Sequence, residues 1–396
     1  MSIFKLGGTI YHPTHSLPLL KRMEGSARHI APVVIETFLQ RNRTGSGPME
    51  QRAGESLPPR WRQSCSRLEE RYEAMARFDG TVDESLYEEA GYEKKTEIYR
   101  AVFKTNPEAW NSHIRNNHNL ILDAANRLQN RKVIAILGAG PAIDLPLNGL
   151  VQVFERVILI DIDIQALEEA RSSLPSEFQK RVELRRRDVF GASFQYLSEV
   201  KKILKAGGHS RNIIQKVIKM TKEFRVTGPV RLLGPGEKVD LLVSDMMVTQ
   251  LVAVLTAYVG QKLLPKYIEQ GQEVGMTLIA DMKQAQWSFF VRAYEDHLHS
   301  LGDYSDLVVV TADMVNRKFW QTKQGMVPLG PAETVQLGTR RLAHLMTSHY
   351  RILEERNWGW RFLMPGGMGE QISQVQGLIV EPLKSLPAPV SNVVSS

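Results

Sequence analysis

Two glycines and an aspartate stand at the ends of two apolar runs in the middle of the chain. Val133–Leu137 ends in Gly138-Ala139-Gly140, and Val157–Ile160 ends in Asp161. Glycines let a backbone turn tightly and approach a ligand, because no Cβ stands in the way. An acid about 20 residues beyond such glycines is placed to accept hydrogen bonds from the two hydroxyls of a ribose. The pattern predicts a pocket for an adenosine-bearing cofactor.

The next small residue bears on the identity of that cofactor. A dinucleotide-binding fingerprint has a third glycine three residues after the second, but this chain has Ile143 there and its small residue earlier, at Ala142. The spacing Gly138-x-Gly140-x-Ala142 resembles the first motif of the class I S-adenosylmethionine-dependent methyltransferases, in which Gly-x-Gly-x-Gly is usual. Four later segments resemble the family's second to fifth strand ends, in the required order: Val157–Asp163, Val182–Val189, Val239–Met246 and Gly275–Asp281.

The resemblance covers roughly residues 115 to 385 and implies both a fold and an activity. The fold is α/β, with a doubly wound, seven-stranded class I methyltransferase sheet and an N-terminal helical extension. The activity is methyl transfer, with S-adenosyl-L-methionine as the cofactor. Such a transfer needs binding, alignment and exclusion of water rather than a metal. We expect no metal site, because the chain has one cysteine and its histidine pairs lack a third ligand.

The resemblance also implies which residues contact the cofactor. Asp161 is expected at the ribose hydroxyls, whereas Asp163 is placed to cap the following helix. Asp144 either approaches the methionine amine or is an acid at a helix N-terminus, stabilised by the macrodipole. Asp188-Val189 either contacts the adenine or belongs to a loop whose acid pairs with Arg185–Arg187. The full cofactor-binding set is Gly138, Ala139, Gly140, Asp144, Asp161, Ile162, Asp188, Val189 and Ser244.

The family places residues that face the transferred methyl group directly after the fourth strand. Ser244-Asp245-Met246-Met247 departs here from Asn/Asp-Pro-Pro-Tyr/Phe, which methyltransferases of exocyclic base amines use, so that substrate class is disfavoured. Cytosine C5 chemistry is also disfavoured, because it needs a cysteine nucleophile and Cys65 lies outside the matched region. Asp245 is the candidate catalytic residue, as a general base or by orienting the acceptor; otherwise it is a polar residue lining the pocket. Trp287 is a further candidate for the substrate pocket.

The composition is that of a soluble globular protein. The chain has 396 residues, of which 43% are hydrophobic and 23% charged, enough to bury a proper core. A single cysteine excludes an internal disulfide. We see no apolar stretch typical of a signal peptide, and the longest apolar segment, Leu241–Val259, is interrupted by polar residues. We therefore expect a cytoplasmic protein with no membrane span.

The net charge of +7 is concentrated in one segment, residues 201–238. Such a concentration attracts phosphate-rich partners through its summed field, which would suit RNA. The alternative, which we favour slightly, is a solvated helix face. The basic residues are Lys201, Lys202, Lys205, Arg211, Lys216, Lys219, Lys222, Arg225, Arg231 and Lys238, against Glu223 and Glu237 alone.

The chain divides by composition and periodicity into four parts. Residues 1–60 have the composition of a poorly ordered segment and linker, and 61–130 have the spacing of a helical cap. Residues 131–385 alternate strand and helix as a cofactor-binding domain, with insertions at about 195–238 and 303–356. Residues 386–396 are expected to be a disordered tail.

Two expectations near the end of the domain concern single elements. Glu333–Arg356 is expected to form a long helix. Trp358–Met364 and Gln374–Pro382 would form the antiparallel pair that the family places at one sheet edge.

Three functions remain open at this point. The favoured one is a methyltransferase acting on a small molecule, with the helical cap closing over it. The second is an RNA methyltransferase that uses the basic segment 201–238 to follow phosphates. The third is a regulatory protein that binds the cofactor but has lost catalysis.

Overall fold

The computed structural model describes residues 81–226, 232–269, 272–322, 325–328, 342–363 and 369–383. By their contacts, the 396 residues divide into Met1–Arg71 and Tyr72–Ser396, and all described residues belong to the second unit. The predictions for residues 1–60 and 386–396, and for the first part of the helical cap, lie outside the described residues.

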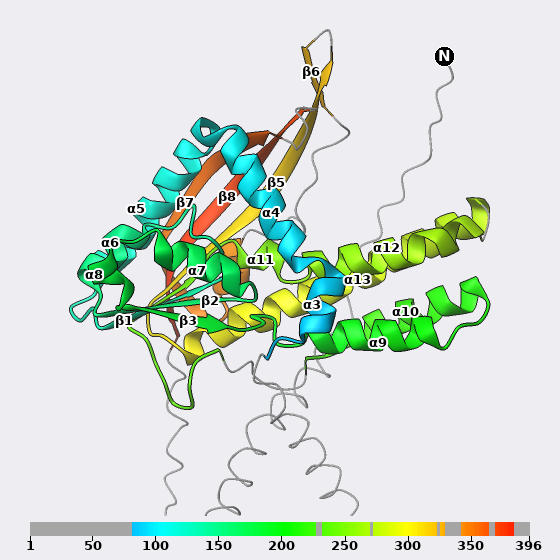
Figure 1. The fold of residues 1–396 in the computed structure, drawn as a ribbon, viewed down its shortest axis with the longest axis horizontal. Helices are drawn as coiled ribbons and strands as arrows, with labels where there is room; N and C mark the ends of the chain where they lie inside the picture. The colour runs from blue at the N-terminus through cyan, green and yellow to red at the C-terminus, as the bar shows by residue number, and fades with distance from the viewer. Residues whose placement is uncertain are drawn as a thin grey trace, which may run out of the picture. The chain divides into compact units, whose positions relative to one another are not determined.

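A single mixed sheet organises the described residues (Figure 1). Its main path has the order β3-β2-β1-β4-β5-β8-β7, and β6 pairs with β5 beside this path. Strands β1 to β5 of the path are parallel, while β8 runs antiparallel to both β5 and β7. Seven strands with an antiparallel pair at one edge confirm the predicted fold class. The strands are β1 Val133–Leu137, β2 Arg156–Asp161, β3 Val182–Arg186, β4 Leu241–Ser244, β5 Val308–Thr322, β6 Gly325–Pro328, β7 Tyr350–Leu363 and β8 Gly369–Pro382.

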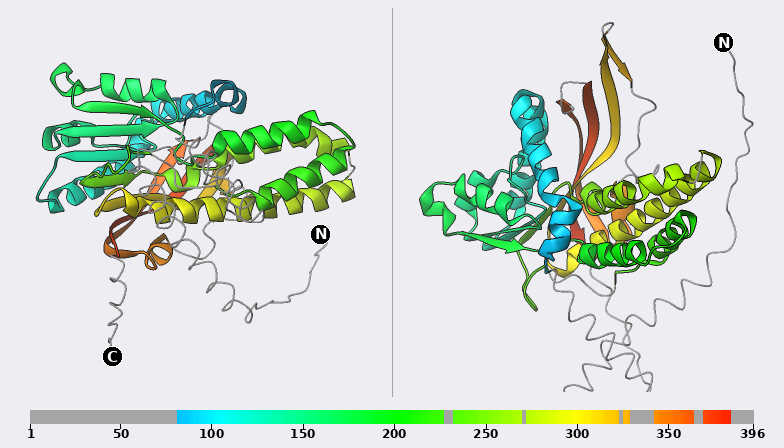
Figure 2. Two further views of the ribbon diagram at one scale, coloured as in Figure 1. Left: turned by 90° about the horizontal axis from the view of Figure 1, so that it is seen from below. Right: turned by 45° about the vertical axis from the view of Figure 1, so that its right-hand side comes forward.

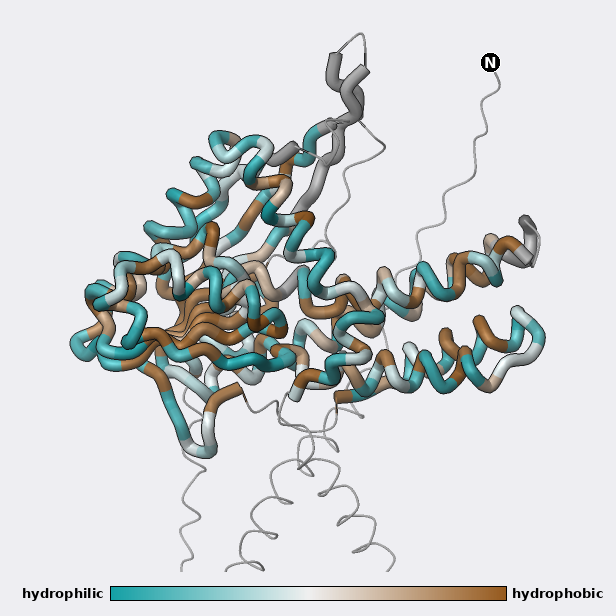
Figure 3. The backbone as a smooth tube through the Cα atoms, viewed as in Figure 1, coloured by the Kyte–Doolittle hydropathy of each residue, from teal (hydrophilic) through white to brown (hydrophobic). Residues whose placement is uncertain are grey.

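The central strands are apolar on both faces, as the sequence indicated. Ile134–Leu137 of β1 and Val157–Ile160 of β2 are fully buried. Parallel strands with helices on both sides need this composition, because neither face meets water. Figure 3 shows these strands as the most hydrophobic part of the backbone, whereas hydrophilic and hydrophobic stretches alternate along the helices around them. Because these strands pair in parallel, their carboxyl ends, and the residues that follow them, lie along one edge of the sheet.

The helical cap precedes the sheet and packs against its antiparallel side. It contains α3 Glu84–Ala90, α4 Tyr92–Thr105, the 3-10 turn η1 Pro107–Trp110 and α5 Asn111–Arg127. The Asp83 carboxylate caps α3 by accepting the Leu86 N–H, at 3.0 Å. Leu120 and Ile121 of α5 are fully buried, and α5 contacts β5, β7 and β8. The cap therefore belongs to the same core as the sheet.

Four long helices lie side by side next to the sheet (Figure 2). Two of them, α9 Ser193–Lys205 and α10 Ser210–Glu223, form a helical hairpin between β3 and β4. The other two, α12 Ala253–Glu269 and α13 Gln272–Ser300, come between β4 and β5. None of the described helices is both long and apolar enough to cross a bilayer. The remaining helical elements are α6 Leu147–Val153, α7 Ile164–Ser172, α8 Ser176–Gln179, α11 Met247–Gln250, η2 Leu301–Asp303 and α14 Leu342–Met346.

The strand predicted at Gly275–Asp281 is wrong, because these residues lie inside α13. A short apolar run does not by itself distinguish a strand from a buried helix. The helical period is visible over a longer window, since the buried side chains Leu278, Met282, Ala285 and Phe289 recur at spacings of three and four. The place beside β4 is taken instead by β5.

The long helix predicted at Glu333–Arg356 is also wrong within the described residues. Residues 342–346 form the short α14, and β7 begins at Tyr350. The strand period shows in β7 itself, where Trp358 and Trp360 are buried and the intervening Gly359 is exposed. The predicted antiparallel pair is confirmed as part of β7 and β8. The range 303–356, expected as an insertion, therefore carries β5 and the first half of β7.

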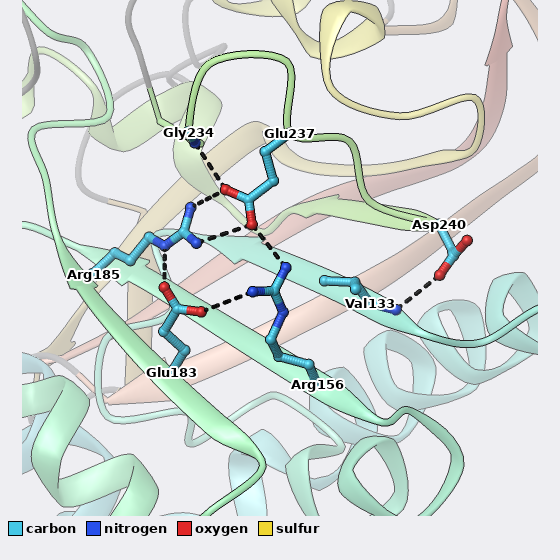
Figure 4. Close-up of polar contacts among 7 residues, drawn as sticks. All are labelled: Val133, Arg156, Glu183, Arg185, Gly234, Glu237 and Asp240. Atoms are coloured by element: carbon cyan, nitrogen blue, oxygen red, sulfur yellow. Dashed lines mark hydrogen bonds and ion pairs between the residues drawn. The ribbon is translucent and has the colours of Figure 1, made fainter.

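The loop before β4 is anchored to β2 and β3 by a network of charges (Figure 4). The Glu237 carboxylate accepts two hydrogen bonds from Arg185, at 2.8 and 3.0 Å, and one from Arg156 at 2.7 Å. The hydrogen bonds from Arg185 lower the pKa of Glu237 to about 2. Asp240 continues the attachment by accepting the Val133 N–H at 2.8 Å. Arg185, which belongs to the basic run before Asp188, thus forms hydrogen bonds with Glu183 of β3 and with Glu237.

Candidate functional site

A cavity of about 350 Å³ opens where β1, β2 and β4 end. Pockets of this size bind small molecules, and the carboxyl ends of parallel strands are where open α/β sheets bind ligands. The cap closes the cavity from one side, because Tyr99 and Trp110 are in its wall. The predicted site residues that line it are Gly138, Ala139, Gly140, Asp144, Asp161, Ile162, Asp188, Val189 and Asp245.

The two glycines of the turn after β1 differ in the space around them. A Cβ on Gly138, whose φ is +71°, would lie 2.0 Å from the Met247 sulfur, so the Met247 side chain would have to move to admit it. A Cβ on Gly140, whose φ is +46°, would meet no atom within 4 Å. Ala142 is also left-handed, with φ 55°, a conformation in which the Cβ of alanine is disfavoured and glycine is not. The first glycine serves the fold, and the second leaves room for a ligand.

Asp161, at the end of β2, is held by the glycine turn. One carboxylate oxygen accepts the Gly140 N–H at 3.0 Å and the other accepts the Asp163 N–H at 2.9 Å. Burial raises the pKa of Asp161, although these hydrogen bonds oppose the rise. Asp163 has the separate role predicted for it, because its side chain caps α7 through Gln165 and Ala166. Asp161 therefore lies fixed at the cavity wall, with a lone pair left on each oxygen.

Asp188 shapes the loop that leads from β3 into α9. Its carboxylate accepts the N–H groups of Phe190 and Ser193, at 3.1 and 2.8 Å, and the Ser193 hydroxyl at 2.8 Å. Burial is the main influence on its pKa, which it raises. The alternative pairing with Arg185–Arg187 is not found, since Arg186 pairs instead with Glu84 of α3. Asp188 and its neighbour Val189 both line the cavity.

Asp144 is not the helix N-terminal acid that one alternative described. It precedes α6 by three residues and is buried against the cap. Its carboxylate accepts the Tyr99 hydroxyl at 3.0 Å and lies 3.3 Å from His113 Nε2. Trp358 donates its indole N–H to His113 Nδ1 at 3.0 Å, so the ring carries its hydrogen on Nε2 and donates to Asp144. Burial alone would raise the pKa of Asp144, but the bonds from His113 and Tyr99 lower it.

Asp245 lies at the same end of the cavity, directly after β4. One of its oxygens accepts the Asn117 amide at 3.0 Å and the Thr311 hydroxyl at 2.7 Å. Burial and the charge of Asp144 raise the pKa of Asp245 to about 8. Asp313 of β5 is nearby, and the same two causes raise its pKa to about 7. The site thus combines one carboxylate of low pKa with two of high pKa.

Two predicted pocket residues lie elsewhere. Ser244 is fully buried and its hydroxyl lies 2.8 Å from Nε2 of His297, on α13. Trp287 is also on α13, where it stacks on Phe290. Neither residue lines the cavity. Ser244 points away because successive residues of a strand face opposite sides, and Trp287 was placed by a strand that does not exist.

The sequence reasoning missed several polar and aromatic residues of the cap, β5 and β7 that line the cavity or interact with its carboxylates. They include Lys95, which contacts Gln250 and whose pKa burial lowers to about 8. One signal was present, because His113 and Asn117 are polar residues four apart on the buried face of α5. The others carried no local signal. The missed residues that the site uses are Lys95, Tyr99, Trp110, His113, Asn117, Thr311, Asp313 and Trp360.

Comparison with known proteins adds structural neighbours only. No family model matches the chain, and no curated protein matches it. An S-adenosylmethionine-dependent methyltransferase from Clostridium acetobutylicum is similar in structure at 9% identity and a TM-score of 0.32, over 73% of this chain and 98% of that one. The glycopeptide N-methyltransferase MtfA has 9% identity and a TM-score of 0.31, over 67% of this chain and 94% of that one. At these values the functional argument rests on the cavity itself.

Proposed function

We propose that this protein is an S-adenosyl-L-methionine-dependent methyltransferase acting on a small-molecule acceptor. The observation that carries the proposal is the side-chain-free face of Gly140, which opens into the cavity beside the Asp161 carboxylate. A glycine that no packing requires, next to an acid with free lone pairs, suits a ligand carrying a ribose.

The residues of the cavity fit the cofactor along its length. The turn Gly138–Gly140 would lie under the methionine portion, and Asp161 would accept hydrogen bonds from the ribose hydroxyls. Asp188-Val189 would border the adenine, with Asp144 near the methionine end. These residues are set by backbone hydrogen bonds and packing, so little reorganisation is needed on binding. The bound cofactor would supply the activated methyl group.

Asp245 is proposed as the residue that orients the acceptor or takes its proton. It lies in the cavity wall, only 5% exposed, and two hydrogen bonds fix one of its oxygens. The pKa of Asp245 is raised to about 8, and a general acid or base is most effective when its pKa lies near the working pH. The enclosure of the cavity by Tyr99 and Trp110 would exclude water from the reacting groups.

Calorimetric titration tests the proposed cofactor. S-adenosylmethionine and S-adenosylhomocysteine are expected to bind the full chain, and NAD is not, since Ile143 and Ala142 depart from the dinucleotide fingerprint. NAD binding without any response to S-adenosylmethionine would end the proposal. Turnover of methyl-labelled cofactor with metabolite, protein and RNA extracts separates an enzyme from a regulatory protein that only binds.

One observation favours RNA as the acceptor instead. Lys216, Lys219 and Lys222 are exposed along one face of α10. If this face follows phosphates, replacing all three by serine should weaken RNA binding for unrelated sequences and flatten its salt dependence, by up to about one unit of slope per lost contact. Fluorescence anisotropy at two salt concentrations measures both. Absent or salt-insensitive binding by the parent protein would leave the small molecule as the acceptor.

A further inference from the structure

Two buried carboxyl groups, Asp144 and Asp245, line the end of the cavity that the cap closes, and a third, Asp313 of β5, lies next to them. Asp144, Asp245 and Asp313 are 6%, 5% and 7% exposed. The Tyr99 hydroxyl lies among them, because it donates to Asp144 and senses the charges of the other two. Asn117 joins two of these positions, since its amide donates to the Asp245 carboxylate and to the Asp144 carbonyl, both at 3.0 Å. We name these five residues the acid cluster.

The protein provides little positive charge to balance this cluster. Within the described part of the chain, no lysine or arginine forms an ion pair with any of the three aspartates. His113 touches Asp144, but its other nitrogen accepts the Trp358 indole N–H, which a doubly protonated ring does not do. Lys95 lines the same cavity but interacts with Asp161 and contacts Gln250. Buried carboxylates without a cation are costly, so a cationic ligand would stabilise them.

Two acceptor atoms in the cluster also lack a donor. Asn117 Oδ1 and Asp313 Oδ1 are buried without a hydrogen-bond partner. Buried polar atoms in folded proteins are nearly always satisfied. The Asn117 amide oxygen can only accept a hydrogen bond, and the Asp313 oxygen also accepts when its carboxyl group is ionised, so one donor group would satisfy both. An ammonium group has three N–H donors and a positive charge, and it matches both deficits.

Aromatic rings border the same end of the cavity. Tyr99, Trp110 and Trp360 all line it, with ring centres 4.9 Å apart for Tyr99 and Trp110 and 4.8 Å apart for Trp110 and Trp360. The faces of such rings attract cations, while their carbon atoms bind apolar groups. A ligand with an ammonium group on an apolar body would contact both the rings and the carboxylates.

We propose that the acid cluster binds an ammonium group and that the methyl acceptor is therefore an amine-bearing small molecule. The assignment of this ligand as the acceptor rests on the proposed function, whereas amine binding itself does not. An ammonium group is also present in S-adenosylmethionine, whose methionine part carries an amine of its own. The experiment therefore needs arms that separate the two amines.

The first arm compares benzylamine with benzyl alcohol, which differ in charge but hardly in size. Each is titrated calorimetrically into the full chain near neutral pH, with and without saturating S-adenosylhomocysteine. We expect the amine to bind at least roughly 10-fold more tightly than the alcohol, as for a charged hydrogen bond. Asp313→Asn and Asp245→Asn should each remove most of this preference. The matched control is Asp163→Asn, a buried aspartate outside the cavity whose capping role asparagine fulfils.

The outcomes separate this inference from the proposed function. Equal binding of the amine and the alcohol to the parent protein overturns the inference, and this comparison needs no variant to fold. The second arm measures S-adenosylhomocysteine against methylthioadenosine, which lacks the amino-acid part. If Asp313→Asn weakens only S-adenosylhomocysteine, the cluster holds the cofactor's own amine and the inference is wrong. If the amine binds but no cofactor does, the proposed function fails and the cation site stands.

Discussion

The two ends of the cavity are built in different ways. At the end that holds Asp161 and Asp188, named the ribose end for the ligand proposed to bind there, both acids accept backbone N–H groups from residues within about twenty positions in the chain. At the acid-cluster end, Asp144 and Asp245 accept side-chain donors from α4, α5 and β5, far away in sequence. The first arrangement forms with the strand ends themselves. The second exists only after the cap has packed on the sheet.

The largest expected effect tests the ribose end. Gly138→Ala should lower the free energy of unfolding by about 2–5 kcal/mol, because its Cβ would overlap Met247 and its backbone is left-handed. Gly140→Ala should cost only about 1–2 kcal/mol, the left-handed penalty alone. Denaturant unfolding measures both. In contrast, Gly140→Ala should weaken S-adenosylhomocysteine binding; an unchanged dissociation constant would show that Gly140 does not face the cofactor.

A pH titration tests the acid-cluster end. The folded-state pKa values of Asp245 and Asp313 are raised to about 8 and about 7, above the ordinary value near 4. The folded state therefore binds more protons than the unfolded state between these values, and the free energy of unfolding falls as pH rises from about 4 to 8. Asp245→Asn should remove about 2 kcal/mol or more of this fall. Denaturant unfolding over this range provides the measurement.

The charge network at the opposite strand ends gives the control for that titration. The pKa of Glu237 is lowered to about 2, so its contribution is present above the ordinary value and is lost only as pH falls towards 2. Glu237→Gln should lower stability by about 1–3 kcal/mol without changing the slope between pH 4 and 8. If both variants change that slope equally, the cluster is not its source.

A smaller effect is expected from the link between the cap and the sheet. Asn117→Ala removes the donor to Asp245 and to the Asp144 carbonyl, and should cost about 1–3 kcal/mol of stability. Because Asn117 does not touch the ribose end, methylthioadenosine affinity should stay within about twofold. Thermal unfolding and titration of the same sample test this together. A large loss of methylthioadenosine affinity would mean that the two ends are not independent.

The smallest effect is expected at Ala142. Its left-handed backbone disfavours a side chain, whereas glycine there would give the unfolded chain more freedom. These opposing contributions leave Ala142→Gly within about 1 kcal/mol of the parent, on the stabilising side. Denaturant unfolding would show this, and a clear loss of stability would mean that the Ala142 methyl group makes a packing contact that matters.

The sequence predicted β1, β2 and the cavity-lining residues that follow them better than the rest, for a physical reason. β1 and β2 are short runs buried on both faces, and the glycines and Asp161 follow them directly. Residues 275–281 show where such reasoning fails, because a seven-residue apolar run looked like a strand and the helical period needed a longer window. The acid cluster was out of reach, since nothing local to Asn117 or Asp313 indicates that they meet Asp245. Only the tertiary packing of the cap brings them together.

The most direct test of the central claim is the affinity of S-adenosylmethionine for the parent protein, Asp161→Ala and Asp163→Asn. Asp161 and Asp163 are neighbouring acids after β2, but only Asp161 lines the cavity. If Asp161 accepts the ribose hydroxyls, its removal should weaken binding by about 1–3 kcal/mol, while Asp163→Asn should leave the dissociation constant nearly unchanged. An unchanged dissociation constant for a folded Asp161→Ala protein would contradict the proposed cofactor site.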